Sequence, residues 1–372
     1  MSYLALENVS KVFNPGPRAV TAVRDLDLDI AQGEIVALLG SSGCGKTSTL
    51  RMIAGFEELS AGRITLAGTA IHTLAPARRG VAMAFEGYSL YPPLTLRDNI
   101  AFALKSERLP AAQIRARVDE IAALLEIEDI LDRYPASVSG GQQQRASLGR
   151  ALIRGAALHL LDEPMGQLEP QLRALLRGRI KHFIRERGLT AILVTHDQTE
   201  ANALADRIAV MEAGELQQFD TPARLKDRPA NLFTGTFIGE PPMNVFPAEI
   251  RLGDGRLDFA LGGGVTLAYP DTAFPDALRA RLAQAPPLAI GIRPHAVRLA
   301  EGGLPARVTV NQWLGDQTHI AAEFAAGTIV SVAHDRARAA PGSAIGLAID
   351  AHDLHIFDRD SGAALSHGGE LA

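Results

Sequence analysis

The spacing of apolar and polar residues differs between the two halves of the chain. From Ser2 to about Phe237, short apolar segments alternate with segments of helical periodicity, which is typical of an α/β fold with a parallel sheet. Residues 25–30 alternate strictly between Asp and apolar side chains and predict a half-buried strand. Residues 34–39 are almost continuously apolar and predict a strand that ends in a glycine-rich turn.

Two further helices and two further strands are predicted in this half. The helices are marked by apolar residues at helical spacing, Ile114, Val118, Ile121 and Leu125 in one and Leu172, Leu176, Ile180 and Phe183 in the other. The strands, 157–161 and 191–195, both end in polar residues. Ligands bind beyond the carboxyl ends of strands in open α/β sheets, so we expect the functional site there.

The second half begins after a proline-rich segment, 239–242, which is typical of a linker. Its apolar segments are short and separated by glycines, which predicts a small all-β barrel or sandwich. These segments are 257–261, 265–268, 307–310, 328–332 and 354–357. We therefore expect one domain over 1–237 and a second over 238–372, with a frayed end from Ser361 to Ala372.

Composition and charge narrow the function classes. The 372 residues are enough for two or three domains, and 37 basic against 42 acidic residues give a net charge of −5, which disfavours a nucleic-acid binder that relies on bulk charge. A single cysteine excludes an intrachain disulfide and a cysteine-cluster metal site. No apolar stretch approaches the roughly 18 residues that span a bilayer, and the first residues lack a signal-peptide layout. We expect any membrane role to depend on a partner.

Residues 40–47, Gly-Ser-Ser-Gly-Cys-Gly-Lys-Thr, fit the phosphate-binding loop pattern, with an apolar strand before them and a helix after them that Gly55 ends. Glycines let backbone N–H groups turn toward phosphate oxygens at a helix N-terminus. Lys46 is expected to reach the β- and γ-phosphates, and the Thr47 hydroxyl to ligate Mg²⁺. The predicted nucleotide-binding residues are Gly40, Ser41, Ser42, Gly43, Cys44, Gly45, Lys46, Thr47 and Ser48.

Asp162 and Glu163 follow the apolar strand at 157–161. At that strand end Asp162 can hold Mg²⁺ and Glu163 can polarise an attacking water. Alone, the pair is equally well explained as the capped end of a strand. The phosphate-binding loop upstream favours the catalytic interpretation.

A third motif, Ser139 to Arg145, reads Ser-Gly-Gly-Gln-Gln-Gln-Arg just before the Asp-Glu strand. A serine and paired glycines at a helix start offer free N–H donors suited to a γ-phosphate. An ordinary helix cap is the alternative interpretation.

With these motifs the chain resembles the ATP-binding subunits of ABC transporters, and among them the importer ATPases for sugars and polyols. The resemblance spans essentially the whole chain. It implies a P-loop NTPase fold of the ABC cassette type, with a helical subdomain at about 87–150, followed by a small all-β, oligosaccharide-binding-like domain. Residues 237–244, 291–294 and 354–358 resemble landmarks of that second domain, which is regulatory or dimer-stabilising in the family.

The resemblance assigns roles residue by residue. It makes residues 40–47 the Walker A loop and Asp162 and Glu163 the Walker B pair, and it makes His196 the switch histidine that senses the γ-phosphate. The signature loop, which binds the ATP of a partner subunit, is Ser139, Gly140, Gly141 and Gln142. Phe13 falls where an aromatic ring stacks on adenine, with a strand core residue as the alternative.

Two positions depart from the family pattern. Glu86 stands where the family usually has glutamine; it keeps an oxygen for Mg²⁺ but adds a third acidic group near Asp162 and Glu163, so we expect one carboxyl to titrate upward. Glu169 stands where the family usually has aspartate. The chain is then either an active cassette that tolerates both changes, which we favour, or a degenerate one that hydrolyses poorly beside a different active subunit. Cys44 is interpreted either as a small apolar filler or, beside helix-start amides and Lys46, as a thiol with a lowered pKa whose alkylation would block nucleotide binding.

The resemblance also implies partners. Two cassettes, as a homodimer or a heterodimer, sandwich ATP with Mg²⁺ and drive two membrane permease subunits, with a solute-binding protein on the outside. The subunit is expected as a peripheral protein at the cytoplasmic face of the cell membrane, with no nucleic-acid partner, and residues 86–96 border the groove where the permease docks. The segment 84–88 resembles ATPases of glycerol or polyol importers.

Two other classes remain as alternatives. A soluble, non-transport ABC ATPase typically holds two cassettes or a coiled-coil insert, and this chain has one cassette and no heptads. A nucleotide-dependent regulatory module would use its β domain to bind a signalling protein. The proteins that co-purify with the chain would separate these classes.

Overall fold

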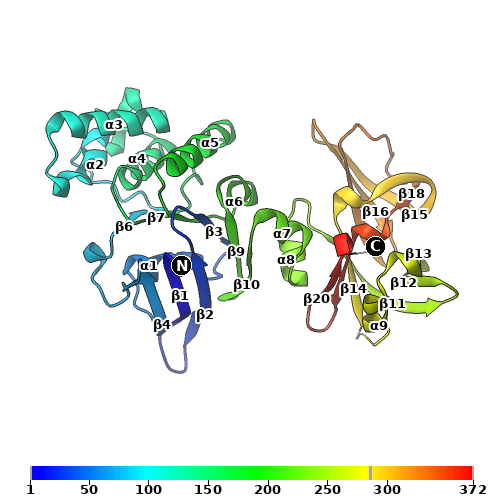
Figure 1. Ribbon diagram of the computed structural model, residues 1–372. Helices are drawn as coiled ribbons and strands as arrows, with labels where there is room; N and C mark the ends of the chain where they lie inside the picture. Colours follow the sequence, from blue (N-terminus) through cyan, green and yellow to red (C-terminus); the bar gives the residue numbers. More distant parts are fainter. Residues whose placement is uncertain (1, 285–286, 371–372) are drawn as a thin grey trace. The chain divides into compact units, whose positions relative to one another are not determined.

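The structure is a computed structural model that describes residues 2–284 and 287–370. It divides into two compact units, Met1–Pro222 and Ala223–Ala372 (Figure 1). The first unit mixes helices with two sheets, and the second is built mainly of strands. The α/β-then-β order predicted from the apolar pattern is confirmed.

The larger sheet of the first unit has six strands in the order β10-β9-β3-β8-β7-β6. All neighbours are parallel except β10, which is antiparallel to β9. The strands are β3 (Ile35–Gly40), β6 (Val81–Ala84), β7 (Leu158–Asp162), β8 (Ala191–Val194), β9 (Arg207–Glu212) and β10 (Glu215–Asp220). Every residue of β3, β7 and β8 is buried, and the carboxyl ends of β3, β6, β7 and β8 share one edge of the sheet.

The second sheet of this unit is antiparallel, in the order β2-β1-β4-β5. Its strands are β1 (Leu4–Phe13), β2 (Val20–Ile30), β4 (Ala61–Leu66) and β5 (Thr69–Ala70). Leu26, Leu28 and Ile30 are buried and the intervening Asp27 and Asp29 are exposed, as the alternation predicted.

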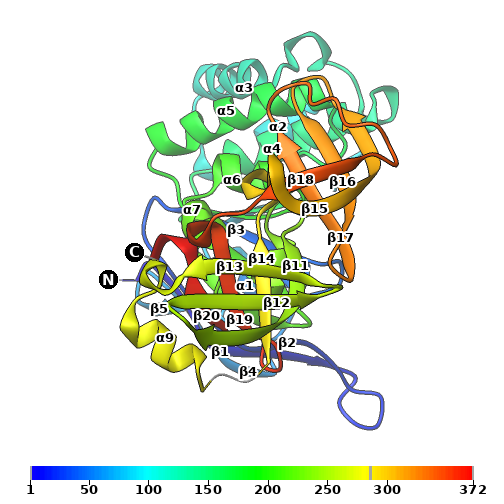
Figure 2. The same ribbon diagram turned by 90° about the vertical axis from the view of Figure 1, so that its right-hand side faces the viewer.

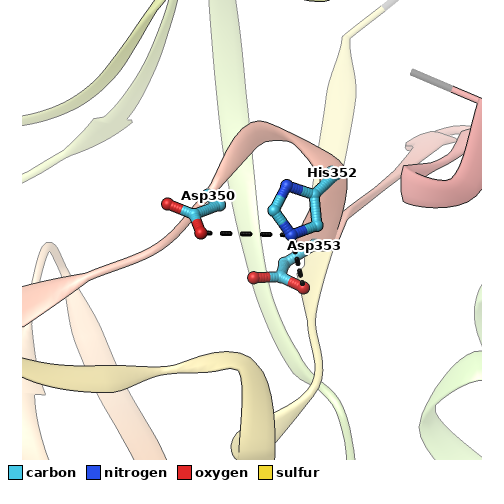
Figure 3. A group of neighbouring side chains, drawn as sticks. All are labelled: Asp350, His352 and Asp353. Atoms are coloured by element: carbon cyan, nitrogen blue, oxygen red, sulfur yellow. Dashed lines mark ion pairs between the residues drawn. The ribbon is translucent and has the colours of Figure 1, made fainter. Parts of the chain in front are cut away.

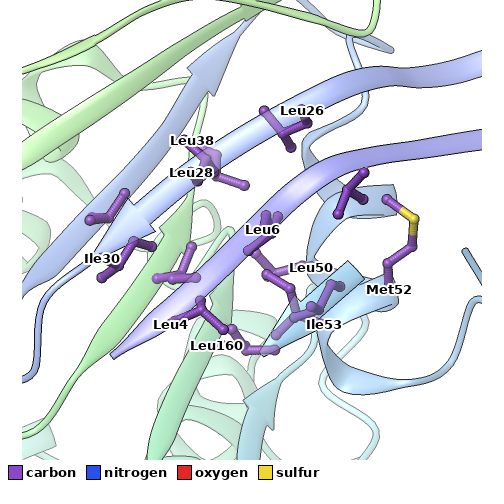
Figure 4. Close-up of a cluster of buried hydrophobic side chains, with 14 of the residues drawn as sticks. Leu4, Leu6, Leu26, Leu28, Ile30, Leu38, Leu50, Met52, Ile53 and Leu160 are labelled. Atoms are coloured by element: carbon purple, nitrogen blue, oxygen red, sulfur yellow. The ribbon is translucent and has the colours of Figure 1, made fainter. Parts of the chain in front are cut away.

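One core joins both sheets to helix α1 (Lys46–Ala54). Figure 4 shows leucine and isoleucine side chains of β1 and β2 beside those of α1 and of the parallel sheet. The members drawn include Leu4, Leu6, Leu26, Leu28, Ile30, Leu38, Leu50, Met52, Ile53 and Leu160. This packing fixes α1, and with it the loop that joins β3 to α1.

Five more helices belong to the first unit: α2 (Leu96–Phe102), α3 (Ala111–Leu125), α4 (Gly140–Leu152), α5 (Pro170–Glu186) and α6 (Gln198–Leu204) (Figure 1). Both helices predicted from apolar spacing are present as α3 and α5, and their buried residues include Val118, Ile121, Ile180 and Phe183. Helices α2, α3 and α4 lie within the segment predicted as a helical subdomain. None of the helices in 2–284 and 287–370 has the length and apolarity needed to cross a membrane.

The second unit holds two antiparallel sheets, in the orders β13-β12-β11-β14-β19-β20 and β17-β16-β15-β18 (Figure 2). Side chains from both, such as Phe259, Ile290 and Phe324, form one core. Its strands are β11 (Asn244–Gly253), β12 (Arg256–Gly262), β13 (Val265–Pro270), β14 (Leu288–Ile292), β15 (Arg298–Trp313), β16 (Thr318–Phe324), β17 (Gly327–Ala333), β18 (Ala344–Ala348), β19 (Leu354–Asp358) and β20 (Ala364–His367). Each of the five predicted apolar segments lies within one of these strands. Helix α9 (Asp276–Leu282) follows β13.

The division between the units comes earlier than the predicted boundary at 237/238. Helix α7 (Pro222–Asp227) lies at the division, and α8 (Leu232–Phe237) belongs to the second unit. The reason is Arg293, which donates to the carbonyl oxygens of Gly235 (2.8 Å), Ile238 and Lys226 (2.7 Å). The proline-rich segment 239–242 therefore connects two elements of one unit instead of linking two domains.

The predicted fraying from Ser361 onward is wrong for the described residues. Strand β20 pairs with β19, and His367 is buried against His355, with the two Nδ1 atoms 3.1 Å apart. Pairing with β19 holds this segment, a contact that the composition of the tail does not reveal. Residues 371 and 372, which the prediction included, lie outside the described residues.

Candidate functional site

The loop between β3 and α1 has a backbone that only glycine allows at several positions. Gly43 and Gly45 have φ of 81° and 104°, in the left-handed region. A Cβ on Gly40 would lie 2.1 Å from the carbonyl oxygen of Met211. Lys46 begins α1 and folds back over this loop, where its Nζ donates to the carbonyl oxygens of Gly40 (2.7 Å) and Ser41 (2.9 Å). The predicted phosphate-binding loop is thus formed, with its ammonium group held at the loop.

Beside this loop lies a cavity of about 340 Å³ at the carboxyl edge of the parallel sheet. It brings together residues that are far apart in the sequence. The predicted site residues that line it are Ser42, Gly43, Lys46, Thr47, Glu86, Glu163 and His196. The other lining residues, which we did not predict, are Gln144, Gly166, Gln167 and Val194.

Three carboxyl groups, those of Asp162, Glu86 and Glu163, lie near enough to one another to interact electrostatically. Asp162 ends β7, and its Oδ1 accepts a hydrogen bond from Thr47 Oγ1 at 3.3 Å. Burial, followed by the charges of Glu86 and Glu163, raises the pKa of Asp162 to about 6. The raised pKa has the direction that we expected for one of these carboxyl groups, but its largest cause is burial and not the charge of Glu86. Carboxylate and hydroxyl oxygens are the ligands that Mg²⁺ prefers, and a cation here would offset the crowded negative charge, so Thr47, Asp162 and Glu86 fit Mg²⁺.

The side chains of Glu163 and His196 contact each other at the cavity wall. His196 follows β8 and lies with Nδ1 2.9 Å from Glu163 Oε2. The His196 side chain is 69% exposed and that of Glu163 only 17%, so the histidine lies toward the open side of the carboxylate. Glu163 has φ 48°, an unusual value for a residue with a side chain, and its amide donates to Val194 O at 3.0 Å. A carboxylate in this place can accept a proton from a water in the cavity.

The signature residues start helix α4 with a capping box. Ser139 Oγ accepts from the Gln142 amide at 3.3 Å, and Gln142 Oε1 accepts from the Ser139 amide at 2.9 Å. The helix-cap interpretation is therefore correct as local structure. Ser139, Gly140, Gly141 and Gln142 do not line the cavity of their own chain. A binding role for them requires a ligand held by another subunit.

Phe13, the last residue of β1, is half-buried and does not line the cavity. Lys11 Nζ lies 4.7 Å from the centre of its ring. The ring is absent from the buried core of the unit, which counts against the strand-core alternative. Its stacking on adenine stays a prediction.

The structure also shows the surroundings of Cys44, which was predicted to be a reactive thiol, and of Glu169, which departs from the family pattern. Cys44 is only 2% exposed, and burial raises the pKa of its thiol even with Lys46 Nζ at 3.7 Å. The predicted low-pKa, reactive thiol is therefore wrong, because desolvation outweighs the nearby ammonium group. Glu169 is the exposed N-cap residue of α5 and makes no side-chain capping bond.

Gln144 is a site residue that sequence reasoning missed. Its side chain is 4% exposed; Nε2 donates to Glu163 O at 2.7 Å and Oε1 accepts from the Gln167 amide at 2.9 Å. One amide group thus ties helix α4 to the backbone on both sides of Gly166. The only available sequence signal is its place in the glutamine run after the signature glycines.

Asp350, His352 and Asp353 form a separate group of potential metal ligands in the second unit, with ligand atoms within 4.8 Å of one another (Figure 3). Arg298 already pairs with this group, donating to Asp350 and lying 3.7 Å from Asp353 Oδ2. We interpret the group as an ion-pair network in which the arginine supplies the positive charge.

Comparisons with known proteins match both units. The model of the ABC transporter family matches residues 23–166, and that of the TOBE domain matches 290–357. The sn-glycerol-3-phosphate import ATP-binding protein UgpC of Cereibacter sphaeroides is 40% identical, covering 98% of this chain and 100% of that protein. The trehalose import ATP-binding protein SugC of Mycobacterium tuberculosis is 39% identical, covering 98% and 99%.

Solved structures match more than half of the chain. A dimeric, post-hydrolysis ATP-binding cassette bound to ADP and Pi has a TM-score of 0.55 at 26% identity, covering 59% of this chain and 98% of that one. A dimeric bacterial ABC transporter cassette gives a TM-score of 0.56 at 27% identity over the same shares.

Proposed function

Since the chain belongs to the family of ATP-binding subunits of ABC transporters, we propose that it hydrolyses ATP to power a membrane importer for a carbohydrate or a polyol. The observation that carries this proposal is the cavity in which Lys46, Glu163 and His196 converge. The relatives named for import of sn-glycerol-3-phosphate and of trehalose support the solute class, which includes glycerol derivatives.

Binding of the triphosphate uses the loop at residues 40–45. Its amides and the start of α1 receive the phosphate oxygens. Lys46 Nζ, now held by Gly40 O and Ser41 O, exchanges these neutral partners for the β- and γ-phosphates. Thr47, Asp162 and Glu86 would hold Mg²⁺, which offsets the phosphate charge when bound. Phe13 stacks on adenine.

Hydrolysis uses the pair at the cavity wall. Glu163 accepts the proton of the attacking water, and His196, 2.9 Å from its Oε2, orients that carboxylate and contacts the γ-phosphate. The first domain thus acts mainly by positioning and by charge.

Completion of the site requires a second ATPase subunit, identical or different, whose Ser139, Gly140, Gly141 and Gln142 contact the same nucleotide. We assign ATP hydrolysis to the first unit, Met1–Pro222, and a regulatory or dimer-stabilising role to the second unit, Ala223–Ala372. The dimer acts on two permease subunits, and indirectly on a solute-binding protein, as a peripheral protein at the cytoplasmic face of the cell membrane.

Hydrolysis of Mg-ATP by the purified full-length chain tests this function. We expect Glu163→Gln to abolish turnover while nucleotide binding persists, because the carboxylate is needed for proton transfer and not for binding. Equal turnover in Glu163→Gln and wild type would refute the role of Glu163. Glu86→Gln separates the two alternatives for the cassette: we expect it to keep the wild-type rate, whereas a degenerate cassette would gain activity from it.

A further inference from the structure

Glu200 on helix α6 is a buried carboxyl group that the proposed reaction does not use. Its side chain is 2% exposed and does not line the cavity. Glu200 Oε2 accepts a hydrogen bond from Thr195 Oγ1 at 2.8 Å, and Oε1 is buried without a hydrogen-bond partner among the described residues. Within those residues Glu200 forms no ion pair with a basic side chain.

This environment favours the protonated form of Glu200. A neutral carboxyl leaves one polar atom without a partner, whereas a carboxylate would leave a buried negative charge with a single hydroxyl donor, which costs far more. The charged groups that face Glu200 are Asp197 at the start of α6, Glu163 after β7 and Arg173 on α5. Arg173 is already paired with Asp197, with Nη1 3.1 Å from Oδ2. Burial, together with Asp197 and Glu163, raises the pKa of Glu200 to about 7.

The hydrogen bond of Glu200 acts on the turn that carries His196. Thr195, just before His196, is fully buried, and its Oγ1 also accepts from the Asp197 amide at 3.0 Å. Because its hydroxyl proton goes to Glu200, a lone pair of Thr195 Oγ1 is directed to that amide. Asp197 Oδ1 in turn accepts from the Glu200 amide at 3.0 Å. The residues on both sides of His196 are thus fixed by contacts that start at Glu200.

We propose that neutral Glu200 is a positioning residue of the ATPase site, which fixes the Thr195 hydroxyl and thereby the turn that places His196 against Glu163. Ionisation of Glu200 places a further negative charge beside Glu163 and Asp197, and although the Thr195 hydroxyl donates more strongly to a carboxylate, the repulsion between these carboxylates displaces the turn. The turn then holds His196 less well, and hydrolysis slows. This inference rests on the proposed ATPase activity.

The test is the pH dependence of kcat for the full-length chain, between pH 6 and pH 9, in wild type and Glu200→Gln. The amide keeps an oxygen for Thr195 and cannot ionise, so we expect Glu200→Gln to retain the wild-type kcat at pH 6 and to lose the decline on the alkaline side that Glu200 produces. Glu200→Ala is expected to lower kcat about tenfold, with KM for ATP changed by less than about twofold, because only positioning is lost.

Glu186→Gln is the matched control, because Glu186 lies on α5 with 69% of its side chain exposed. It should reproduce the wild-type profile. Glu200→Ala removes a core side chain and risks unfolding, so the conservative Glu200→Gln carries the test. Matching alkaline declines in wild type and Glu200→Gln would overturn the role of Glu200 and leave the ATPase activity standing. A wild type without ATP hydrolysis at any pH would instead overturn the proposed function, and this inference with it.

Discussion

Both units bury ionisable side chains that form no ion pair among the described residues, and the surroundings of Glu200 in the first unit differ from those of Arg293 in the second. In the first unit Glu200 accepts a hydrogen bond from one hydroxyl group, that of Thr195. Burial is the main cause that raises the pKa of Glu200 to about 7. In the second unit Arg293, 5% exposed, donates to the carbonyl oxygens of Gly235, Ile238 and Lys226. Burial lowers the pKa of Arg293 only to about 10.

The difference follows from what each side chain can do with its proton. A carboxyl group can become neutral when it is buried, so the fold needs to supply few hydrogen-bond partners for it. A guanidinium stays charged over the physiological range, so the fold must surround it with backbone carbonyl dipoles. The permanent charge of Arg293 also affects its neighbour His355. Burial of His355, and then the positive charge of Arg293, lowers the pKa of His355 to about 3. The surroundings of Glu200 are therefore sensitive to pH, whereas those of Arg293 accommodate a permanent charge.

Replacement of Arg293 should have the largest effect on stability. Arg293→Met removes donors from three carbonyl oxygens that hold α7 and α8, and we expect it to cost about 3–5 kcal/mol of the free energy of unfolding of the second unit. Thermal unfolding measures the loss, and hydrogen exchange at residues 226–238 localises it. Arg298→Met is the control, because 51% of that side chain is exposed and its ion pairs lie at the surface. Unchanged stability of Arg293→Met would mean that the carbonyl contacts are dispensable.

A change of pH should change the stability of the two units in opposite directions. His355 has a folded-state pKa below its usual 6.5, so its contribution is complete above that value and is lost as the pH falls; at pH 5 the loss is about 2 kcal/mol. Glu200 has a raised pKa, so its contribution is complete below about 4.5 and is lost as the pH rises through about 7. Between pH 7 and pH 5 the second unit should weaken, whereas in the first unit Glu200 and Asp162 together gain stability against the opposing loss from His159, whose pKa burial lowers.

Hydrogen exchange of peptides around 191–205 and 354–367, corrected for the intrinsic pH dependence of the exchange rate, measures the change in stability of each unit with pH. His355→Phe keeps a ring of similar size and removes the titration, so the acid-induced loss in the second unit should shrink. A loss of similar size in both units on acidification would contradict the contrast between them.

Local rules were enough to predict much of this molecule. The alternation at 25–30 and the buried run at 34–39 each correspond to a strand, because burial on one or both faces is recorded directly in the residue pattern. The phosphate-binding loop could be located because its glycines, lysine and threonine are adjacent in sequence. Asp162 and Glu163 could be located because they stand at the end of an apolar strand, whereas His196, which follows a second such strand, was identified through the family resemblance.

Contacts between distant segments were the part that could not be predicted. The division at Pro222, and not at the proline-rich segment, depends on Arg293 reaching α7 and α8 across the fold. The thiol of Cys44 was mispredicted because its burial depends on packing that the loop sequence does not show. Gln144 and Glu200 are polar residues on helices, and nothing in the sequence distinguishes their buried positions from exposed ones.

We expect the smallest effect on stability from replacement of Gln144, whose uncharged side-chain amide contacts the backbone at the ATPase site. Gln144→Ala removes the donor to Glu163 O and the acceptor for the Gln167 amide, which we expect to cost about 1–2 kcal/mol and to lower kcat by loosening the backbone that carries Glu163. Because an amide does not titrate, kcat should fall by the same factor at every pH, unlike the effect expected from Glu200. Gln143→Ala is the control, since among the described residues the Gln143 side chain donates only to Val138 O, at 3.3 Å. If the loss of kcat in Gln144→Ala grew with pH, Gln144 would act through the ionisation of its neighbours. The contrast between Gln144, which does not titrate, and Glu200, which does, would then fail.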